Sequence, residues 1–248
     1  MNLGLADKIA LVVGASSGIG AATAEVLAEE GADVVVGYGH DHEGAERTAQ
    51  SVDRLGRRSW LMEMDIRQPE AVTQAVERIQ TDVGLLDLLI FCAGRNTLTS
   101  WEAIRSEEWE EIVGTNLTGA FYVLKATVPL LRQGGSIVTV ASVAAHTGAP
   151  HHAHYAAAKA GLVNLTKSLA RSLAPRIRVN CVAPGITMTP MGQQTIRSLP
   201  SNYAEEKIPL RRFATPQEIA KCIVFVASPI AGFMTGATID INGGRDLR

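Results

Sequence analysis

Short runs of β-branched and apolar residues alternate with longer segments of helical period along the whole chain, and this alternation restricts the fold. Most of the runs are apolar throughout, as expected for parallel strands that helices cover on both faces. The strand candidates are Ile9–Val13, Asp33–Val36, Arg58–Asp65, Leu86–Ala93, Ser136–Ala141, Arg178–Ala183 and Ala237–Ile241. With right-handed crossovers, this order predicts one α/β domain over residues 1–248: a Rossmann-type doubly wound, mainly parallel, seven-stranded sheet with helices on both faces.

The helix candidates lie between these strands: Ile19–Glu30, His42–Leu55, Pro69–Val83, Ser106–Leu131, Ala153–Leu173 and Pro216–Ser228. One long region, Ile186–Leu210, shows no clear period and contains several prolines. A loop of that length inside a compact domain is usually functional, so we expect a substrate loop or lid over residues 186–210. Its apolar side chains, among them Met188 and Met191, fit either core packing or a mobile lid over an apolar substrate.

Composition excludes several classes of partner. The 248 residues carry a formal net charge of −2 and no block of Lys or Arg, so neither nucleic acid nor an anionic membrane surface is expected as a partner. No apolar run approaches the roughly 20 residues of a membrane span, and the N-terminal segment lacks the pattern of a secretory signal. Cys92, Cys181 and Cys222 are odd in number and widely spaced, which fits neither a disulfide framework nor a metal site. We therefore expect a cytoplasmic protein.

A glycine-rich turn follows the first predicted strand directly. In Gly14-Ala15-Ser16-Ser17-Gly18-Ile19-Gly20, three residues separate the first two glycines and one separates the last two. Glycines allow a tight turn and a close approach of the backbone to a pyrophosphate, which sits at the positive end of the following helix. A purely structural turn before a helix looks similar. The place of this one, after the first buried strand of an alternating fold, favours nucleotide binding.

Tyr155 and Lys159 lie four residues apart in a helical segment, so their side chains project from one face. Hydride transfer to a carbonyl leaves an alkoxide that needs a proton, and alcohol oxidation needs the reverse transfer. A free phenol has a pKa of about 10, and a neighbouring ammonium is expected to lower that pKa. An isolated pair at this spacing is more often part of an ordinary amphipathic helix. Here Ser142 ends the fifth predicted strand, where doubly wound sheets present ligand-side residues, so the set predicts a catalytic site.

Further short motifs follow in order along the chain: Asp65-Ile66, Cys92-Ala93-Gly94, Pro184-Gly185 with Thr187 and Thr189, Thr235-Gly236, and Asn242-Gly243-Gly244. Together with Gly14-x-x-x-Gly18-Ile19-Gly20, they resemble the short-chain dehydrogenase/reductase family over essentially the whole chain. Val13 departs from the family's usual Thr, and Phe91 and Cys92 replace both asparagines of the family's Asn-Asn-Ala-Gly motif. Side-chain hydrogen bonds to the cofactor are therefore lost there, while backbone contacts from Ala93 and Gly94 are expected to survive.

The resemblance implies an NAD(P)-dependent oxidoreductase that moves a hydride between a nicotinamide ring and a carbonyl or secondary alcohol. It implies that Tyr155 is the general acid/base, that Ser142 hydrogen-bonds the substrate oxygen, and that Lys159 also bonds the nicotinamide ribose. Asn116 matches the family's fourth catalytic member, whose amide holds a water that relays protons to the lysine. Because Asn is mildly unfavourable inside a helix, a local bend is the alternative at this position.

Cofactor contacts are implied in the same way. Asp65 and Ile66 match the position that contacts the adenine, and the segment from Pro184 to Thr189 resembles the one that holds the nicotinamide carboxamide and opens the substrate loop. Folds that prefer NAD place an acidic residue after the second strand, to bind the ribose 2′-hydroxyl. That place falls on Tyr38, so NADP is favoured, with NAD possible. The family's usual basic partner is replaced by Ser17, which leaves His40, Ser16 and Ser17 as candidate partners of a 2′-phosphate.

The nearest subgroup is the 3-oxoacyl-[acyl-carrier-protein] reductases, because the runs Ile208–Arg212 and Thr215–Ala220 resemble theirs. Those reductases dock an acidic carrier with basic residues near the mouth of the active site. Arg176 matches one such position and Gln133 falls at the other, so carrier docking is the weaker expectation. A homotetramer is the implied assembly, with a dimer possible. The alternative from another class is a non-catalytic module that binds NAD(P) and reports its state.

Four histidines cluster before the predicted catalytic tyrosine: His146, His151, His152 and His154. The segment lacks the spaced His and Glu patterns of zinc enzymes, so no metal site is expected. We predict that these histidines form the rim of the active site.

Overall fold

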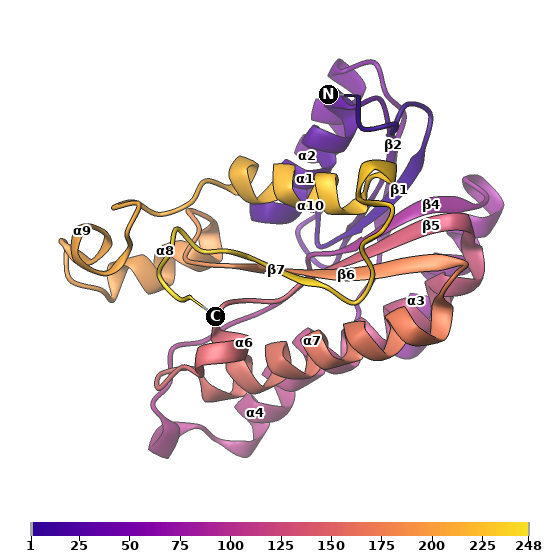
Figure 1. The fold of residues 1–248 in the computed structure, drawn as a ribbon. Helices are drawn as coiled ribbons and strands as arrows, with labels where there is room; N and C mark the ends of the chain where they lie inside the picture. Colours follow the sequence, from indigo (N-terminus) through magenta and orange to yellow (C-terminus); the bar gives the residue numbers. More distant parts are fainter. Residues whose placement is uncertain (1, 248) are drawn as a thin grey trace.

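The computed structural model describes residues 2–247, whose strands form one seven-stranded sheet in the order β3-β2-β1-β4-β5-β6-β7 (Figure 1). Every neighbouring pair is parallel. The strands are β1 (Ile9–Val13), β2 (Asp33–Tyr38), β3 (Ser59–Glu63), β4 (Leu86–Phe91), β5 (Leu131–Val140), β6 (Ile177–Pro184) and β7 (Thr238–Ile241). The predicted doubly wound parallel sheet is confirmed.

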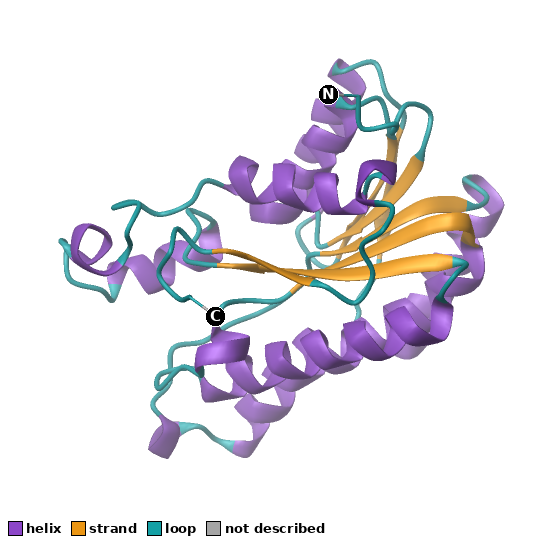
Figure 2. Ribbon diagram, viewed as in Figure 1, coloured by secondary structure: helices purple, strands orange, loops and turns teal. Residues whose placement is uncertain are grey.

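Helices cover both faces of the sheet (Figure 2). On one face pack α1 (Gly18–Glu29), α2 (His42–Arg54) and α10 (Pro216–Ala227), and on the other α3 (Pro69–Asp82), α5 (Gly119–Thr127) and α7 (Ala153–Leu173). Successive side chains of a strand point to opposite faces, so in β1 Ala10 and Val12 join the first core while Leu11 and Val13 join the second. Both faces are buried, which explains the uniformly apolar strands. Within residues 2–247, no helix is long and apolar enough to cross a membrane.

Two strands, β3 at the edge of the sheet and β4 in its centre, end earlier than the sequence indicates. β3 ends at Glu63 rather than Asp65, and β4 ends at Phe91 rather than Ala93. The strand order reverses between β1 and β4, so the connections that leave these two strands diverge, which accounts for the early end of β4. The apolar residues beyond each end line a cavity instead of continuing the sheet.

The single helix predicted over Ser106–Leu131 is wrong, because the segment is divided. It consists of α4 (Ser106–Val113), a π-helical turn (Gly114–Thr118), α5 and a 3₁₀ turn (Val128–Leu130), and Leu131 already belongs to β5. The side-chain amide of Asn116 donates to the carbonyl oxygen of Ile112 at 2.8 Å, and so competes with the backbone for that acceptor. A wider turn of this kind is frequent at functional sites.

The region Ile186–Leu210 is also more ordered than predicted, since it contains α8 (Pro190–Arg197) and α9 (Tyr203–Lys207). α8 has a clear start signal: the Thr189 hydroxyl accepts a hydrogen bond from Gly192 N at 2.9 Å, and Pro190 occupies the first turn. Both helices are too short to give a visible apolar period. They project beyond the carboxyl ends of the strands, where a lid would lie (Figure 1).

Candidate active site

A cavity of about 590 Å³ opens at the carboxyl edge of the sheet, where the strand order reverses. Doubly wound folds bind their ligands at this place. Every residue that the sequence assigned to the cofactor lines it: Gly14, Ser16, Ser17, Gly18, Ile19, Gly20, Tyr38, His40, Asp65, Ile66, Cys92, Ala93, Gly94, Tyr155, Lys159, Pro184, Gly185, Thr187 and Thr189. Residues far apart in the sequence are therefore brought to one cavity.

The start of α1 has the form of a phosphate site. Ser17 caps this helix with extended backbone, but its side chain makes no capping hydrogen bond, and the first turn holds no acidic residue. The N–H groups of that turn stay open to an anion at the positive end of the helix. Gly14 has a φ of 83°, and a Cβ there would lie 2.6 Å from Ala93 Cα. Only glycine allows the two loops to meet this closely, so the turn fits a pyrophosphate.

Tyr38, Gly39 and His40 line the cavity at the end of β2, and the nearby Glu46 and Glu63 do not. Tyr38 is buried there, and its hydroxyl lies 2.9 Å from His42 Nδ1. The nearby Asp41 is engaged as the cap of α2, where its carboxylate accepts from Gly44 N at 2.9 Å. His40 lines the cavity and is exposed. The residues that line the cavity at this end therefore include no acidic partner for the ribose hydroxyls, as NAD-selective folds have.

The adenine end is built from ion pairs. Burial alone would raise the pKa of Asp65, but hydrogen bonds from Arg67 and Gln68 outweigh it and lower this pKa. Glu111 lies 3.0 Å from Arg95 and 4.0 Å from Arg67. The two carboxylates that line the cavity are thus both neutralised by arginines.

Ser142, Tyr155 and Lys159 come together at the other end. Tyr155 lies in the first turn of α7, and Lys159 Nζ is 5.6 Å from the centroid of its ring. The ammonium donates to Val140 O, the last residue of β5, at 2.8 Å. Ser142 is the second residue after that strand and hydrogen-bonds the phenol. The end of one strand and one face of one helix therefore place all three groups.

Burial controls the pKa values of this set. It raises the pKa of Tyr155 to about 12, against a smaller effect of the Ser142 hydrogen bond, and it lowers the pKa of Lys159 to about 8. The expectation that Lys159 lowers the pKa of the phenol is therefore wrong for the protein by itself. Both groups lose solvent together, and the loss disfavours phenolate and ammonium alike. The phenol keeps its proton at neutral pH, as a proton donor must.

Asn116 stands apart from the cavity. It is fully buried, and its amide donates to the carbonyl oxygens of Ile112 and Arg95 while its Oδ1 accepts from Arg95 N at 3.3 Å. Both amide hydrogens are thus used on the protein. Asn116 fixes the loop after β4 against the π-helical turn, and Gly94 of that loop would carry a Cβ only 2.7 Å from Asn116 Oδ1.

The histidines divide into two groups. His151 and His152 line the cavity, as predicted for the rim. His154 is fully buried, so the rim prediction is wrong for it. Its Nε2 lies 3.0 Å from Thr97 Oγ1 and 3.5 Å from Glu108 Oε1, and its Nδ1 accepts from Tyr155 N at 2.8 Å. His146 Nε2 lies 3.9 Å from Asp240 Oδ1. No three His, Cys, Asp or Glu side chains among residues 2–247 form a metal site.

Glu108 of α4 is the centre of this buried polar cluster. The hydroxyls of Thr97 and Thr99 each donate to its Oε1 at 2.6 Å. These hydrogen bonds, with a smaller contribution from His154, lower the pKa of Glu108 to about 2. The cluster ties α4 and the loop after β4 to the residue before Tyr155. Apart from His154, its members are single polar residues without a motif, so no sequence pattern indicated the cluster.

The sequence predicted a substrate loop but not which individual side chains line the substrate end of the cavity. Its further lining residues come from four separate segments and include Asn96, Leu98, Thr195, Ser198, Leu199, Tyr203 and Arg245. The residues of α8 and α9 lie within the substrate loop predicted over residues 186–210, and Arg245 directly follows the motif Asn242-Gly243-Gly244, whereas Asn96 and Leu98 had no signal.

Arg176 lies away from the mouth of the cavity. It directly precedes β6, at the edge of the sheet opposite the cavity, and its guanidinium donates to Leu131 O at 3.0 Å. Gln133 lies in the exposed first part of β5 at the same edge. The expectation that these positions flank the mouth of this chain's own active site is wrong, because parallel strands present their amino and carboxyl ends at opposite edges.

Comparison with known proteins agrees with this geometry. Residues 14–246 match the family model described as Enoyl-(Acyl carrier protein) reductase. The chain is 36% identical over 241 residues to the 3-oxoacyl-[acyl-carrier-protein] reductase FabG of Staphylococcus epidermidis, covering 96% of this chain and 98% of that protein. The reductase of the same name from Aquifex aeolicus is 36% identical over 248 residues, covering 98% and 99%. A solved short-chain dehydrogenase/reductase (SDR:Glucose/ribitol dehydrogenase) from Brucella melitensis matches with a TM-score of 0.94 and 35% identity over 100% of both chains.

Proposed function

The chain belongs to the short-chain dehydrogenase/reductase family of NAD(P)-dependent oxidoreductases that act on CH–OH and C=O groups, and from that premise we propose that it uses NADPH to reduce the ketone of a 3-oxoacyl thioester or a related carbonyl compound. The observation that carries the proposal is the set of Ser142, Tyr155 and the buried Lys159, which meets at the end of the cavity away from the phosphate turn.

When bound, the nicotinamide supplies the hydride that reduces the carbonyl carbon. Ser142 donates a hydrogen bond to the carbonyl oxygen and holds it beside Tyr155. Tyr155 gives that oxygen its proton as negative charge develops, and the high pKa of the phenol means that the proton is present to be given. The Lys159 ammonium, held by Val140 O, faces the ring of Tyr155 and stabilises the phenolate left behind.

The cofactor is held by the residues that line the other half of the cavity. The open N–H groups at the start of α1 hold the pyrophosphate, Asp65 and Ile66 contact the adenine, and Pro184 to Thr189 hold the carboxamide. Cys92 serves through its backbone, because burial raises the pKa of its thiol to about 12 and leaves it neutral. Asn116 acts as a positioning residue for this loop.

NADP is the proposed cofactor because the end of β2 presents Tyr38, His40 and the hydroxyls of Ser16 and Ser17 to a 2′-phosphate, and no carboxylate lines the cavity at this end to repel it. The measurement is kcat/KM with NADPH and with NADH. We expect NADPH to be preferred, and a tenfold preference for NADH, about 1.4 kcal/mol, would contradict the assignment.

The relatives act on carrier-bound 3-oxoacyl groups, and the direct test is a panel of initial rates. NADPH oxidation would be followed with 3-oxoacyl thioesters and simple ketones, and NADP⁺ reduction with secondary alcohols. A rate on 3-oxoacyl thioesters above that on simple ketones supports the proposal, and no oxidation with any carbonyl contradicts it. The alternative of a non-catalytic sensing module is not favoured, since such a module has no need of the proton donor and its buried lysine.

A homotetramer in the cytoplasm completes the proposal. Exposed aromatic side chains support an assembly: Phe121 on α5 is 45% exposed, and Phe233, just before β7, is fully exposed. The three cysteines are free thiols, as expected in a reducing compartment. Light scattering after gel filtration distinguishes a tetramer from a dimer.

A further inference from the structure

Arg245 lines the substrate end of the cavity and has no part in the proton transfer. Arg245 follows β7 in a turn that the side chain of Asn242 stabilises by two hydrogen bonds. The Asn242 Oδ1 accepts from Gly244 N at 2.9 Å, and its Nδ2 donates to Asp246 O at 2.8 Å. The guanidinium carbon lies 5.8 Å from the centroid of the Tyr203 ring in α9. The arginine is thus fixed between the C-terminal turn and the lid.

The donors of this guanidinium are unused. Within residues 2–247 its side chain donates no hydrogen bond, and its ion pair with Asp246 joins Nε to Oδ2 at 3.7 Å, which is beyond hydrogen-bond distance. A guanidinium has five N–H donors in a fixed fork that matches a carboxylate or a phosphate. The side chain is only 31% exposed, so bulk water does not fully replace the missing partners.

Two neighbouring histidines add further hydrogen-bonding groups, while the carboxylate of Asp246 lies beyond hydrogen-bond distance of Arg245. His151 and His152 line the same end of the cavity. Burial, followed by the positive charges of His154, His151 and Arg245, lowers the pKa of His152, which makes it a neutral hydrogen-bonding group at neutral pH. The two carboxylates among the lining residues are paired with arginines at the adenine end.

We propose that Arg245, assisted by His151 and His152, binds an anionic group of the carbonyl substrate, so that the enzyme selects charged over neutral carbonyl compounds. The proposal rests on the proposed function, because this subsite belongs to the same substrate cavity. Its ligand chemistry is a carboxylate or a phosphate. A free oxo acid carries the first near its ketone, and a thioester on a phosphorylated carrier arm carries the second further away.

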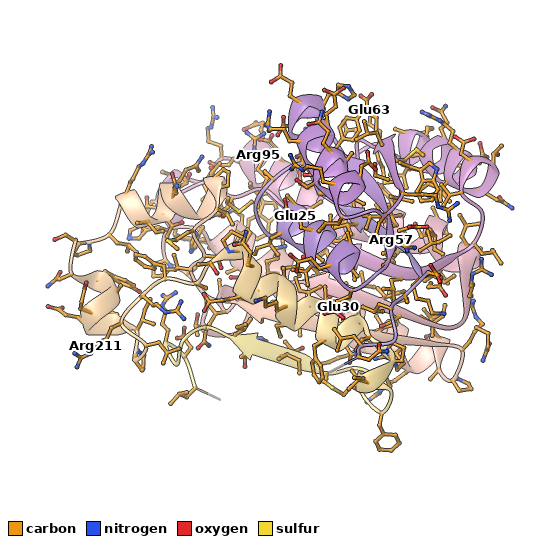
Figure 3. All side chains as sticks on the ribbon, turned by 90° about the horizontal axis from the view of Figure 1, so that it is seen from above. Glu25, Glu30, Arg57, Glu63, Arg95 and Arg211 are labelled. Carbon is orange, nitrogen blue, oxygen red and sulfur yellow. The ribbon has the colours of Figure 1, made fainter. Side chains whose placement is uncertain are left out.

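Three compounds that share one acyl group but differ in their anionic group distinguish a carboxylate from a phosphate. The substrates are 3-oxobutanoate, its coenzyme A thioester and its uncharged N-acetylcysteamine thioester, tested with wild type and Arg245→Gln. A charge-assisted pair is the strong kind of hydrogen bond, so we expect KM for one charged form to rise about tenfold or more, with KM for the neutral thioester changed by less than about twofold. The matched control is Arg211→Gln on the neighbouring segment, whose side chain projects away from the molecule (Figure 3).

The outcome identifies the anion or rejects it. A selective loss on 3-oxobutanoate assigns a carboxylate, and a selective loss on the coenzyme A thioester assigns a phosphate. An equal loss on all three forms, or no loss on any, overturns the proposal.

Calorimetric binding of 3-hydroxybutanoate and of phosphopantetheine to the NADP⁺-loaded protein gives a readout without turnover. If no carbonyl is reduced but Arg245→Gln abolishes this binding, the subsite stands and the proposed function fails. If neither compound binds to wild type and all three forms are reduced equally well, the function stands and the subsite fails.

Discussion

The two halves of the cavity are built in different ways. In the cofactor half, the lining residues follow directly from the ends of β1 to β4 and β6 and from the start of α1, where glycines keep the loops close. In the substrate half, the contacts come from side chains on α8, α9, the turn before α7 and the C-terminal segment. The first half is shaped by the sheet itself, while the second is added around it. Substitutions in the cofactor half should therefore disturb every reaction of the enzyme, and those in the substrate half should alter the choice of substrate.

The largest effect is expected at the junction of the halves, for Tyr155→Phe. The change removes one oxygen and preserves the ring, while general acid catalysis contributes about 10²–10⁴-fold. We expect kcat to fall at least about a hundredfold and NADPH affinity to change little, because the phosphate turn lies at the other end of the cavity. The measurements are single-turnover reduction and NADPH fluorescence titration.

Two further variants are compared with Tyr155→Phe. Tyr122→Phe removes a hydroxyl from α5, away from the cavity, and should leave kcat unchanged. Lys159→Ala should weaken both the rate and NADPH binding, since the resemblance gives this lysine a ribose contact. A Tyr155→Phe enzyme that keeps more than about a tenth of the wild-type rate would show that Tyr155 is not the acid.

Gly94→Ala tests the cofactor half at the point where its backbone lies closest to Asn116 and Lys159. A Cβ there would lie 2.7 Å from Asn116 Oδ1 and 3.3 Å from Lys159 Nζ, so the buried amide or the ammonium must move. Displacing a catalytic group by a fraction of an ångström is costly, and we expect kcat/KM to fall about tenfold for every carbonyl substrate. Gly114→Ala is the control, because its Cβ would meet nothing within 4 Å. A loss confined to one substrate would contradict the assignment of this loop to the cofactor half.

The pH dependence tests the electrostatics of the same junction. Burial lowers the pKa of Lys159 to about 8 and raises that of Tyr155 to about 12, so below pH 8 the pair is ammonium and phenol. Raising the pH through about 8 removes the positive charge while the phenol stays protonated. We therefore expect kcat for reduction to be level below pH 8 and to decline above it. Steady-state rates with saturating NADPH from pH 6 to 10 measure this, and a level profile throughout would argue against a role for the ammonium.

The difference between the halves also explains what the sequence predicted. The glycine turn, the strand ends and the spacing of Tyr155 and Lys159 are local patterns, each set by one strand or one helix. The residues that these patterns identified line the cavity. The position of Arg245 beside Tyr203, and of Arg176 at the far edge, depends on how separate segments pack. Asn116 lies between these cases: its motif was visible, but the π-helical turn arises from a hydrogen bond to Ile112 that no periodicity reveals. The two lid helices were missed because each is shorter than the apolar pattern needed to identify it.

The smallest effect is expected for Glu108→Gln, which tests whether the buried cluster positions the substrate half. Gln keeps the acceptor for Thr97 and Thr99 but removes the charge, and a hydrogen bond to a charged group exceeds a neutral one by about 1 kcal/mol. We expect kcat to fall about threefold, with NADPH affinity unchanged, while the exposed neighbour Glu107→Gln has no effect.

Stability gives a second readout of Glu108→Gln. The pKa of Glu108 is lowered from 4.5 to about 2, so its contribution to stability is full above pH 4.5 and is lost as the pH falls towards 2. Glu108→Gln should lack that part of the acid dependence, measured as unfolding midpoints between pH 5 and pH 3. An unchanged kcat together with a lower midpoint would make the cluster purely structural, whereas a lower kcat at an unchanged midpoint near neutral pH makes Glu108 a positioning residue for Tyr155.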